Sequence, residues 1–535
     1  MSGVLRNKLH GIDSTTSAEG CARRSRSLLS DAPALVLLAI CIANSAQFAD
    51  PDLWGHVAFG LAMIHQKAVL THDTYSYTVA GARYLDHEWL AQVIIAGVYR
   101  NAGIIGLKLL KFVCVGATMM MLAVALEATG ASLAVQSAVL LAASVALIPQ
   151  MLFRPQLFTF ALLAATMALL ARDNYRRPAR LWLAVPMMLL WVNLHGGFVA
   201  GLVALAVYAS VAGVQSLRNR CARRRTLGIG LVITASIVAT LATPYGFDAW
   251  RAVTHTLASH GMLNANQEWI PFVSYVRTGW GAPHSGVSFP LLGVAMLALL
   301  LTTLPFTLRA GDLPLLGVAL VLGVTPFLSV RNLALAVIAT AAPLAHHLEL
   351  LCARYRRYRS IETEPADEMR LRPRSSVILL VLALTITLVS GAFADRLNDG
   401  DRYPSGAIRF IDQHRLHGNI LNDFNWGEYL IYHEAPRCKV FIDGRYQIVY
   451  SPDILSDYLR FAAGGGQALA VVSNYPHDFV LIQPIGPAYR TLATAPGWKL
   501  IYCDSVAALF VRRDSDAATI APVIVRDPGY PGYFP

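Results

Sequence analysis

Residues 34–56 read ALVLLAICIANSAQFADPDLWGH, an apolar run that ends directly in two aspartates and a histidine. A helix needs about 20 mostly apolar residues, at 1.5 Å each, to cross roughly 30 Å of hydrocarbon. The run therefore predicts a first membrane span, and the motif after it predicts polar groups at the membrane surface. A cleaved signal peptide is the alternative for this basic, then apolar, N-terminus. We favour a retained span because the apolar run leads straight into the acidic motif.

The remaining sequence repeats this apolar pattern. Of 535 residues, 55% are hydrophobic and 14% are charged, with a mean hydropathy of +0.48. A typical soluble protein has about a quarter of charged residues, so an ordinary cytosolic enzyme is excluded. We expect an all-α polytopic membrane protein with about eleven transmembrane helices. They are expected near residues 33–48, 105–126, 131–149, 156–171, 181–194, 197–215, 227–243, 288–306, 313–330, 333–350 and 376–393.

Basic residues predict the orientation of the spans. With the N-terminus inside, the inner segments carry 22 lysines and arginines, against seven in the outer connections. This bias places the N-terminus in the cytoplasm and, with an odd number of spans, the C-terminus outside. The net charge of +11 lies mostly in these short loops, so membrane lipids, not nucleic acid, are the expected contacts. The chain has no N-x-S/T acceptor, which favours a bacterial cytoplasmic (inner) membrane with a periplasmic C-terminus.

Three regions follow from this topology. A basic cytoplasmic N-terminus covers 1–32, and a transmembrane domain covers 33–394, with outside loops at 49–104 and 244–287. Residues 395–535 alternate short apolar runs with helical patterns, which predicts a small extracytoplasmic α/β domain with a Pro/Gly/Tyr tail. Strands are expected at 419–421, 439–442, 479–482, 500–502 and 507–511, and helices at 426–433, 453–462, 467–474 and 488–493. Cys438 directly precedes the strand expected at 439–442 and Cys503 directly follows the one at 500–502, either as a disulfide or as two buried thiols.

The first outside loop carries two polar motifs. Asp50 and Asp52 flank Pro51, and His56 follows Asp52 by four residues, on the same face of a helix. An Asp before a Pro is also a common helix start, so Asp50 is either a cap or a site residue. The second motif, Asp86-His87-Glu88, stands at the start of another helix in the same loop. Two such clusters in one loop can converge on a metal ion or on a reacting hydroxyl.

Further polar residues stand in other outside turns. Arg154 and Arg331 occupy two turns on a face that has few basic residues, which indicates anion binding, with snorkelling to lipid headgroups as the alternative. His195 stands before two glycines in a third turn, and Glu268 in the 244–287 loop is either a ligand or a solvated residue.

The terminal domain has a motif of its own. Asp423 follows the first expected strand, and Asp443 and Arg445 follow the second. Ligands of open α/β sheets bind beyond the carboxyl ends of strands, so these residues are candidates for an acceptor or regulatory site. The alternative is that Asp443 and Arg445 pair with each other in a turn.

These motifs resemble a known class of enzymes. A first span with the N-terminus inside, DPDLW at 50–54, HEWL at 87–90 and Arg331 resemble the GT-C-type membrane glycosyltransferases. The similarity is to the branch with aminoarabinose transferases, protein O-mannosyltransferases and RgtA-like enzymes. More narrowly, the chain resembles a mostly uncharacterised group of bacterial membrane proteins over residues 48–513. The segments that carry this second resemblance are DPDLW…H, HEWLAQ, FRPQLFT, NLHGGF, TPYG and FIDGR.

The resemblance implies transfer of a sugar from a polyprenyl-phosphate donor to an acceptor outside the cytoplasm, which the sequence does not identify. A first-loop carboxylate, Asp50 or Asp52, would take the acceptor proton. The residues expected to orient it or to face the acceptor are His56, Asp86, His87, Glu88 and Glu268. Those expected at the donor phosphate are Arg154, His195 and Arg331. The hard oxygen ligands of Asp50 and Asp52 could also hold Mg²⁺ or Mn²⁺.

Two other classes of function, a transporter and a scaffold, are alternatives to the transferase. A transporter would place polar groups at mid-membrane, and the expected spans are nearly free of Asp, Glu and Lys there. A non-catalytic scaffold or assembly factor for envelope polysaccharide would keep the fold without needing convergent acids. The clustering of acids and arginines on one face favours the transferase.

Overall fold

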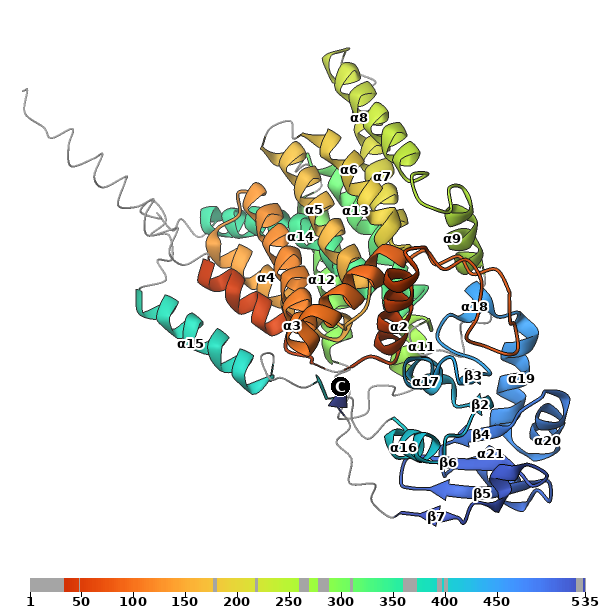
Figure 1. Ribbon diagram of the computed structural model, residues 1–535. Coiled ribbons are helices and arrows are strands. Elements are labelled where there is room, and N and C mark those ends of the chain that lie inside the picture. The colour runs from red at the N-terminus through yellow and green to blue at the C-terminus, as the bar shows by residue number, and fades with distance from the viewer. Residues whose placement is uncertain are drawn as a thin grey trace, which may run out of the picture.

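The computed structural model describes residues 33–47, 49–176, 180–216, 220–258, 269–277, 288–307, 311–358, 373–391, 397–398, 403–525 and 533–534. A bundle of helices forms one end of the molecule, and a small α/β domain forms the other end (Figure 1). Helices of the bundle are Pro33–Ala43, α3 (Trp89–Ala128), α4 (Leu133–Leu147), α5 (Gln156–Tyr175), α6 (Ala184–Leu194), α7 (Phe198–Ser216), α8 (Arg220–Ala239), α12 (Ser288–Thr307), α13 (Leu313–Val324), α14 (Leu333–Tyr358) and α15 (Pro373–Val389).

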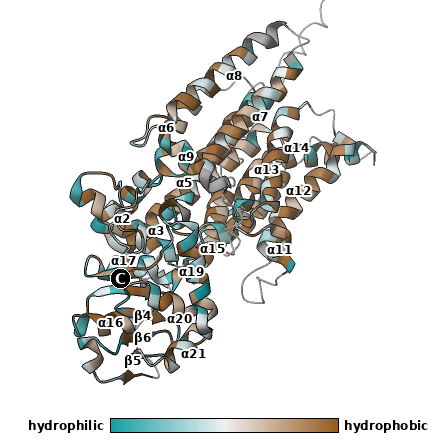
Figure 2. Cartoon of the chain, turned by 90° about the vertical axis from the view of Figure 1, so that its right-hand side faces the viewer, coloured by the Kyte–Doolittle hydropathy of each residue, from teal (hydrophilic) through white to brown (hydrophobic). Residues whose placement is uncertain are grey.

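The bundle has the character of a membrane domain. Six of its described helices are long and apolar enough to cross a membrane, namely α3, α4 with the turn after it, α5, α7, α12 and α14. Shorter apolar helices cover Pro33–Ala43, Leu181–Leu194, Arg225–Ala239 and Leu313–Phe327. Figure 2 shows hydrophobic residues over much of the bundle. The chain is thus a helical membrane protein, while the total of eleven spans remains a prediction.

The loop at 49–104 supplies two helices at the end of the bundle. The first is α2 (Pro51–Gln66), and the second is continuous with the following span as α3, which kinks at Gly103. Gly103 has φ 55° and ψ −148°, a conformation that only glycine adopts readily. The second helix expected in this loop, which begins after Asp86-His87-Glu88, is therefore the first part of α3 and not a separate helix. Further along α3, the Nζ of buried Lys108 donates to the carbonyl oxygen of Gly391 at 2.9 Å.

The terminal domain is built on a mixed sheet with the strand order β3-β2-β4-β6-β5-β7. Its strands are β2 (Gly418–Asn422), β3 (Cys438–Val440), β4 (Phe479–Ile482), β5 (Trp498–Cys503), β6 (Ala508–Arg512) and β7 (Val523–Ile524), and β1 (Leu397–Asn398) pairs with β8 (Tyr533–Phe534). Its helices are α16 (Ser405–Gln413), α17 (Gly427–Glu434), α18 (Tyr446–Val449), α19 (Pro452–Ala463), α20 (Gly465–Asn474) and α21 (Pro487–Thr494). Cys438 and Cys503 are both free thiols, because three strands separate β3 from β5.

Helix α2 joins the two domains. Leu53 and Trp54 are fully buried in the same hydrophobic cluster as Tyr429 and Ile442 of the terminal domain. The loop after α2 also pairs with the edge of the sheet, where the Val440 N–H donates to the Tyr75 carbonyl at 3.0 Å. The outer loop and the terminal domain therefore share one core, and the polar ends of α2 and α3 face that domain. Two short outer helices, α9 (Asp248–Ala258) and α11 (Phe272–Arg277), flank this region.

Candidate active site

One cavity of about 420 Å³ lies where the ends of the helices meet the terminal domain. It is lined by α2, the start of α3, the turns before α5, α7 and α14, and the segment 444–448. The predicted site residues that line it are Asp52, His56, Asp86, His87, Glu88, Arg154, His195, Arg331 and Arg445. Motifs from turns up to about 390 residues apart in the chain thus converge on one space.

The two aspartates at the start of α2 differ in their surroundings. Asp50 caps the helix by accepting from the Asp52 N–H at 3.1 Å, and its carboxylate also accepts from Arg154 Nε at 2.5 Å. Arg154 Nη2 lies 3.3 Å from Asp52 Oδ2. The Asp50 side chain is 5% exposed and the Asp52 side chain 31%. Asp50 is therefore both a cap and an anchor for Arg154, and Asp52 is the carboxylate that lines the cavity.

Glu88 stands between two histidines. Its Oε1 lies 3.4 Å from His195 Nε2 and 3.7 Å from His87 Nε2. His195 Nδ1 accepts from the Gly197 N–H at 2.9 Å, which leaves the proton on Nε2 to donate to Glu88. Burial lowers the pKa of His87 to about 4 and that of His195 well below its usual value, and it raises the pKa of Glu88. Both imidazoles are therefore neutral donors at pH 7.

His56 and Asp86 complete the polar wall on α2 and α3. Burial lowers the pKa of His56 to about 4, so this ring is also neutral at pH 7. Asp86 Oδ1 accepts from the Glu88 N–H at 3.2 Å and from Gln92 Nε2 at 3.1 Å. Burial raises the pKa of Asp86 to about 7. Asp86 thus holds the start of α3 in place while it lines the cavity.

Arg331 provides positive charge in the same cavity. It stands in the short turn Val330–Asn332 before α14, and its guanidinium lies 5.3 Å from the ring centre of Trp269. Among the residues that the structure describes, no carboxylate forms an ion pair with it. Its charge contributes to the lowered pKa of His56, His87 and His195. A buried wall of neutral imidazoles beside an arginine without an acidic partner suits the binding of an anion.

Glu428 on α17 is a cavity residue that the sequence analysis missed. It is only 6% exposed and reaches α2 because three glycines leave room for it. A Cβ on Gly55 would lie 2.1 Å from Glu428 Oε2, and a Cβ on Gly427 would lie 2.4 Å from the Ile442 carbonyl oxygen. A Cβ on Gly444 would lie 2.7 Å from Glu428 Oε1. The only signal in the sequence is one acidic residue in an otherwise apolar helical stretch, WGEYLIY.

This packing gives a first prediction on stability. Gly55→Ala is expected to lower the free energy of unfolding by about 1–3 kcal/mol, because its methyl group collides with the Glu428 carboxyl. Thermal unfolding in nanodiscs measures the effect. Gly97→Ala on α3 is the matched control, since its Cβ would meet nothing closer than 4.0 Å and alanine is the better helix former. If Gly55→Ala lowers the free energy of unfolding equally in the wild-type chain and in the Glu428→Ala variant, the contact between residue 55 and Glu428 is contradicted.

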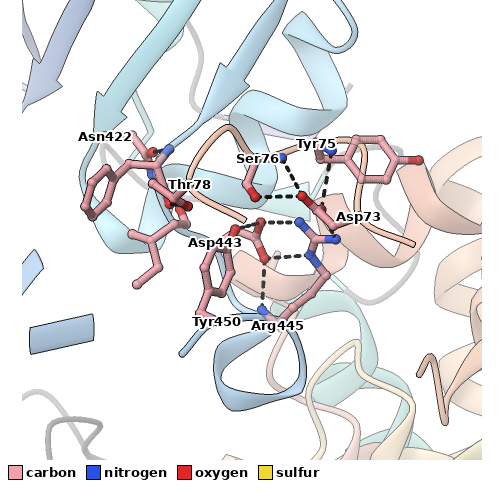
Figure 3. Close-up of polar contacts among 10 residues, drawn as sticks. Asp73, Tyr75, Ser76, Thr78, Asn422, Asp443, Arg445 and Tyr450 are labelled. Atoms are coloured by element: carbon pink, nitrogen blue, oxygen red, sulfur yellow. Dashed lines mark hydrogen bonds and ion pairs between the residues drawn. The ribbon is translucent and has the colours of Figure 1, made fainter. Parts of the chain in front are cut away.

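Asp443 and Arg445 pair with each other, as the turn interpretation expected (Figure 3). Arg445 Nη2 lies 2.7 Å from Asp443 Oδ2, and Nη1 lies 2.7 Å from Asp73 Oδ1 of the first outer loop. Asp73 also accepts from the Ser76 hydroxyl at 2.6 Å, and Tyr450 donates to Asp443 at 2.5 Å. The guanidinium is surrounded by three aromatic rings, with centres at 5.1–5.4 Å, from Phe59, Tyr75 and Tyr84. This buried cluster fastens the outer loop to the terminal domain.

Of the two remaining predicted residues, the structure describes only Asp423. Asp423 caps the short helix Phe424–Trp426 by accepting from the Asn425 N–H at 3.1 Å, and it does not line the cavity. Burial raises the pKa of Asp423. Glu268 lies outside the described residues.

Comparisons with known proteins bear on the fold. No family model matches the sequence, and no curated protein matches it at a significant level. The structure is similar to the oligosaccharyltransferase of Archaeoglobus fulgidus in its apo form, with a TM-score of 0.53 and 11% identity over 92% of this chain and 75% of that one. The structure is also similar to the archaeal oligosaccharyltransferase AglB from Archaeoglobus fulgidus in complex with an inhibitory peptide and a dolichol-phosphate. Here the TM-score is 0.52, with 10% identity over 84% of this chain and 69% of that one. The complex of the same oligosaccharyltransferase with Zn and sulfate has a TM-score of 0.52, with 10% identity over 84% and 68%. The likeness confirms the GT-C fold that the sequence resemblance implies.

Proposed function

We propose that this chain is an integral membrane glycosyltransferase that moves a sugar from a polyprenyl-phosphate donor to an acceptor hydroxyl outside the cytoplasm. One observation carries the proposal, namely that a partly exposed carboxylate, Asp52, and two arginines, Arg154 and Arg331, line the same cavity. A non-catalytic scaffold needs no arginine that lacks an acidic partner inside a buried cavity. The fold adds support, because the archaeal neighbour was solved with a dolichol-phosphate.

The chemistry assigns a role to each side of the cavity. Asp52 takes the proton from the acceptor hydroxyl while the acceptor oxygen forms a bond to the anomeric carbon. The bond between that carbon and the phosphate oxygen breaks, and its electron pair stays on the phosphate. Arg331 and Arg154 stabilise the resulting charge, so that the leaving group needs no proton. His195 donates its Nε2 proton to Glu88, and His87 lies beside the same carboxyl, so Glu88 is held at the cavity wall.

The proposal extends to topology and partners. The N-terminus is cytoplasmic, and the terminal domain from about residue 395 faces the periplasm of a bacterial inner membrane. The donor enters from the bilayer, and the acceptor is a glycan, a lipid or a protein of the envelope.

A metal ion is compatible with the fold, since the archaeal neighbour was solved with Zn and sulfate. The carboxylates of Asp50 and Asp52 do not fit Mg²⁺ or Mn²⁺ in this chain. The guanidinium of Arg154 bridges them and supplies the positive charge between them. Within the described ranges, no group of three or more His, Cys, Asp or Glu side chains has a geometry suited to a metal.

The direct test offers a panel of polyprenyl-phosphate sugars to the full chain in nanodiscs and follows donor loss by mass spectrometry. We expect turnover of at least one donor. Arg331→Met is expected to raise the donor KM about 10- to 100-fold, because a charge-assisted contact to phosphate contributes about 1.5–3 kcal/mol. Arg277→Met is the control, since Arg277 is exposed on α11 outside the cavity. Equal KM values for wild type and both variants would exclude a phosphate site at Arg331.

A further inference from the structure

The carboxyl group of Glu428 is buried beside Asp52. A Cβ on Gly444 would meet Glu428 Oε1 at 2.7 Å and Asp52 Oδ1 at 2.9 Å, so both oxygens lie close to this glycine. On its other side, Asp52 presents Oδ2 to Arg154 at 3.3 Å. The Asp52 carboxylate therefore has a cation at one oxygen and the Glu428 carboxyl near the other.

Among the described residues, no Lys, Arg or His forms an ion pair with Glu428 that would hold it as an anion. Its Oε2 is buried against Gly55 and makes no hydrogen bond. The charged groups around it are Asp52 and Asp50 from α2, and Asp443 and Arg445 from the segment after β3. Arg445 is already engaged by Asp443 and Asp73, each at 2.7 Å. Three carboxylates and one neutralised arginine favour the protonated form of Glu428.

We propose that Glu428 is a positioning residue for the base Asp52, supplied by the terminal domain as a carboxylic acid that donates its proton to Asp52 in a hydrogen bond. This inference rests on the proposed function, in which Asp52 is the base. Burial, followed by the charge of Asp52, raises the pKa of Glu428 well above its usual value, which agrees with a protonated group at neutral pH. The hydrogen bond stabilises the ionised form of Asp52 and fixes the orientation of its carboxylate.

The arrangement also explains why the terminal domain packs on α2. Arg154 of the membrane domain contacts Asp52 at 3.3 Å, and Glu428 adds a carboxyl from the terminal domain. The three glycines at positions 55, 427 and 444 allow a carboxyl from a segment about 370 residues later to reach it. Because the two carboxyls lie close together, they are expected to titrate as a pair.

The test uses two variants of Glu428 in the full chain. Glu428→Ala removes the donor, so the ionised form of Asp52 is less stable, and the acid limb of the kcat/KM profile moves up by about one pH unit. At neutral pH, kcat falls while the donor KM stays within about twofold, since the phosphate contacts are intact. Glu428→Gln keeps an N–H donor at the same place, so its acid limb stays at the wild-type position.

A matched control lies on the same helix. Glu434 is buried on α17, burial raises its pKa to about 7, and it pairs with Arg437 at 3.0 Å without lining the cavity. Glu434→Gln is expected to leave the pH profile unchanged. If Glu428→Ala lowers activity by the same factor at every pH, Glu428 has only a structural role and the proposal is overturned.

An infrared measurement separates this inference from the proposed function. At neutral pH the full chain is expected to show the carbonyl stretch of a protonated carboxylic acid that Glu428→Gln removes and Asp52→Asn shifts. If this band is present but wild type consumes no donor of the panel, the proposed function fails and the carboxyl pair stands. If Glu428→Gln removes no such band, Glu428 is ionised and the pairing is wrong, whatever the turnover.

Discussion

Asp52→Asn is expected to lower kcat for sugar transfer by about 10²- to 10⁴-fold, the usual contribution of a general base. The amide keeps the size of the carboxylate but cannot accept the proton of the acceptor hydroxyl. Donor binding is expected to change little, because Arg331 lines the cavity without forming an ion pair with Asp52 among the described residues. Single-turnover assays with the donor found in the panel measure the chemical step, and donor titration measures binding.

Two further variants serve as comparisons for Asp52→Asn. Asp50→Asn is expected to have a smaller effect on kcat, since asparagine still caps α2 and only the charge contact to Arg154 is lost. Asp423→Asn is the control outside the cavity, where the amide also serves as a cap, and it is expected to behave as wild type. If the Asp50→Asn variant is inactive while the Asp52→Asn variant has nearly normal activity, the general base is Asp50 and not Asp52.

Arg445→Met is expected to lower the free energy of unfolding of the terminal domain by about 3–5 kcal/mol, because it leaves Asp73 and Asp443 as buried carboxylates without a cation. Methionine fills most of the volume between the surrounding rings, so the loss reports on charge more than on packing. The outer loop after α2 is expected to detach from β3 and to become sensitive to protease. Thermal unfolding in nanodiscs and limited proteolysis measure the two effects.

Arg512→Met is the matched control for this prediction. Arg512 on β6 pairs with Asp514 at 2.7 Å, but both side chains are about half exposed or more. Such a surface pair contributes about 0–1 kcal/mol, so the variant is expected to unfold as wild type does. Equal stability of Arg445→Met and wild type would show that the buried cluster does not fasten the loop to the domain.

Much of the fold could be predicted from local patterns. The apolar runs at 479–482 and 507–511 form β4 and β6, and the apolar segments near 156–171 and 197–215 form α5 and α7. These elements follow from hydrophobic periodicity and length, which a single sequence shows directly. The convergence of the first-loop motifs with the turns at Arg154, His195 and Arg331 was expected because all three turns lie on the same predicted face.

Contacts between distant segments could not be predicted in this way. Glu428 reaches α2 only because glycines at three separate places lack side chains, and a lone sequence does not show which segments meet. The pairing of Asp73 with Arg445 depends on the same docking. Asp423 shows a different limit, because an aspartate after a strand predicts a ligand site and a helix cap equally well, and the structure shows the cap.

The most direct test of the account is a cryo-electron microscopy structure of the full chain in nanodiscs with a polyprenyl phosphate. The account predicts density for the phosphate inside the cavity, within hydrogen-bond distance of Arg331 and on the side away from Asp73. It also predicts that the carboxylate of Asp52 faces the space beside that phosphate. A lipid phosphate bound elsewhere on the protein, with this cavity empty, would contradict the account.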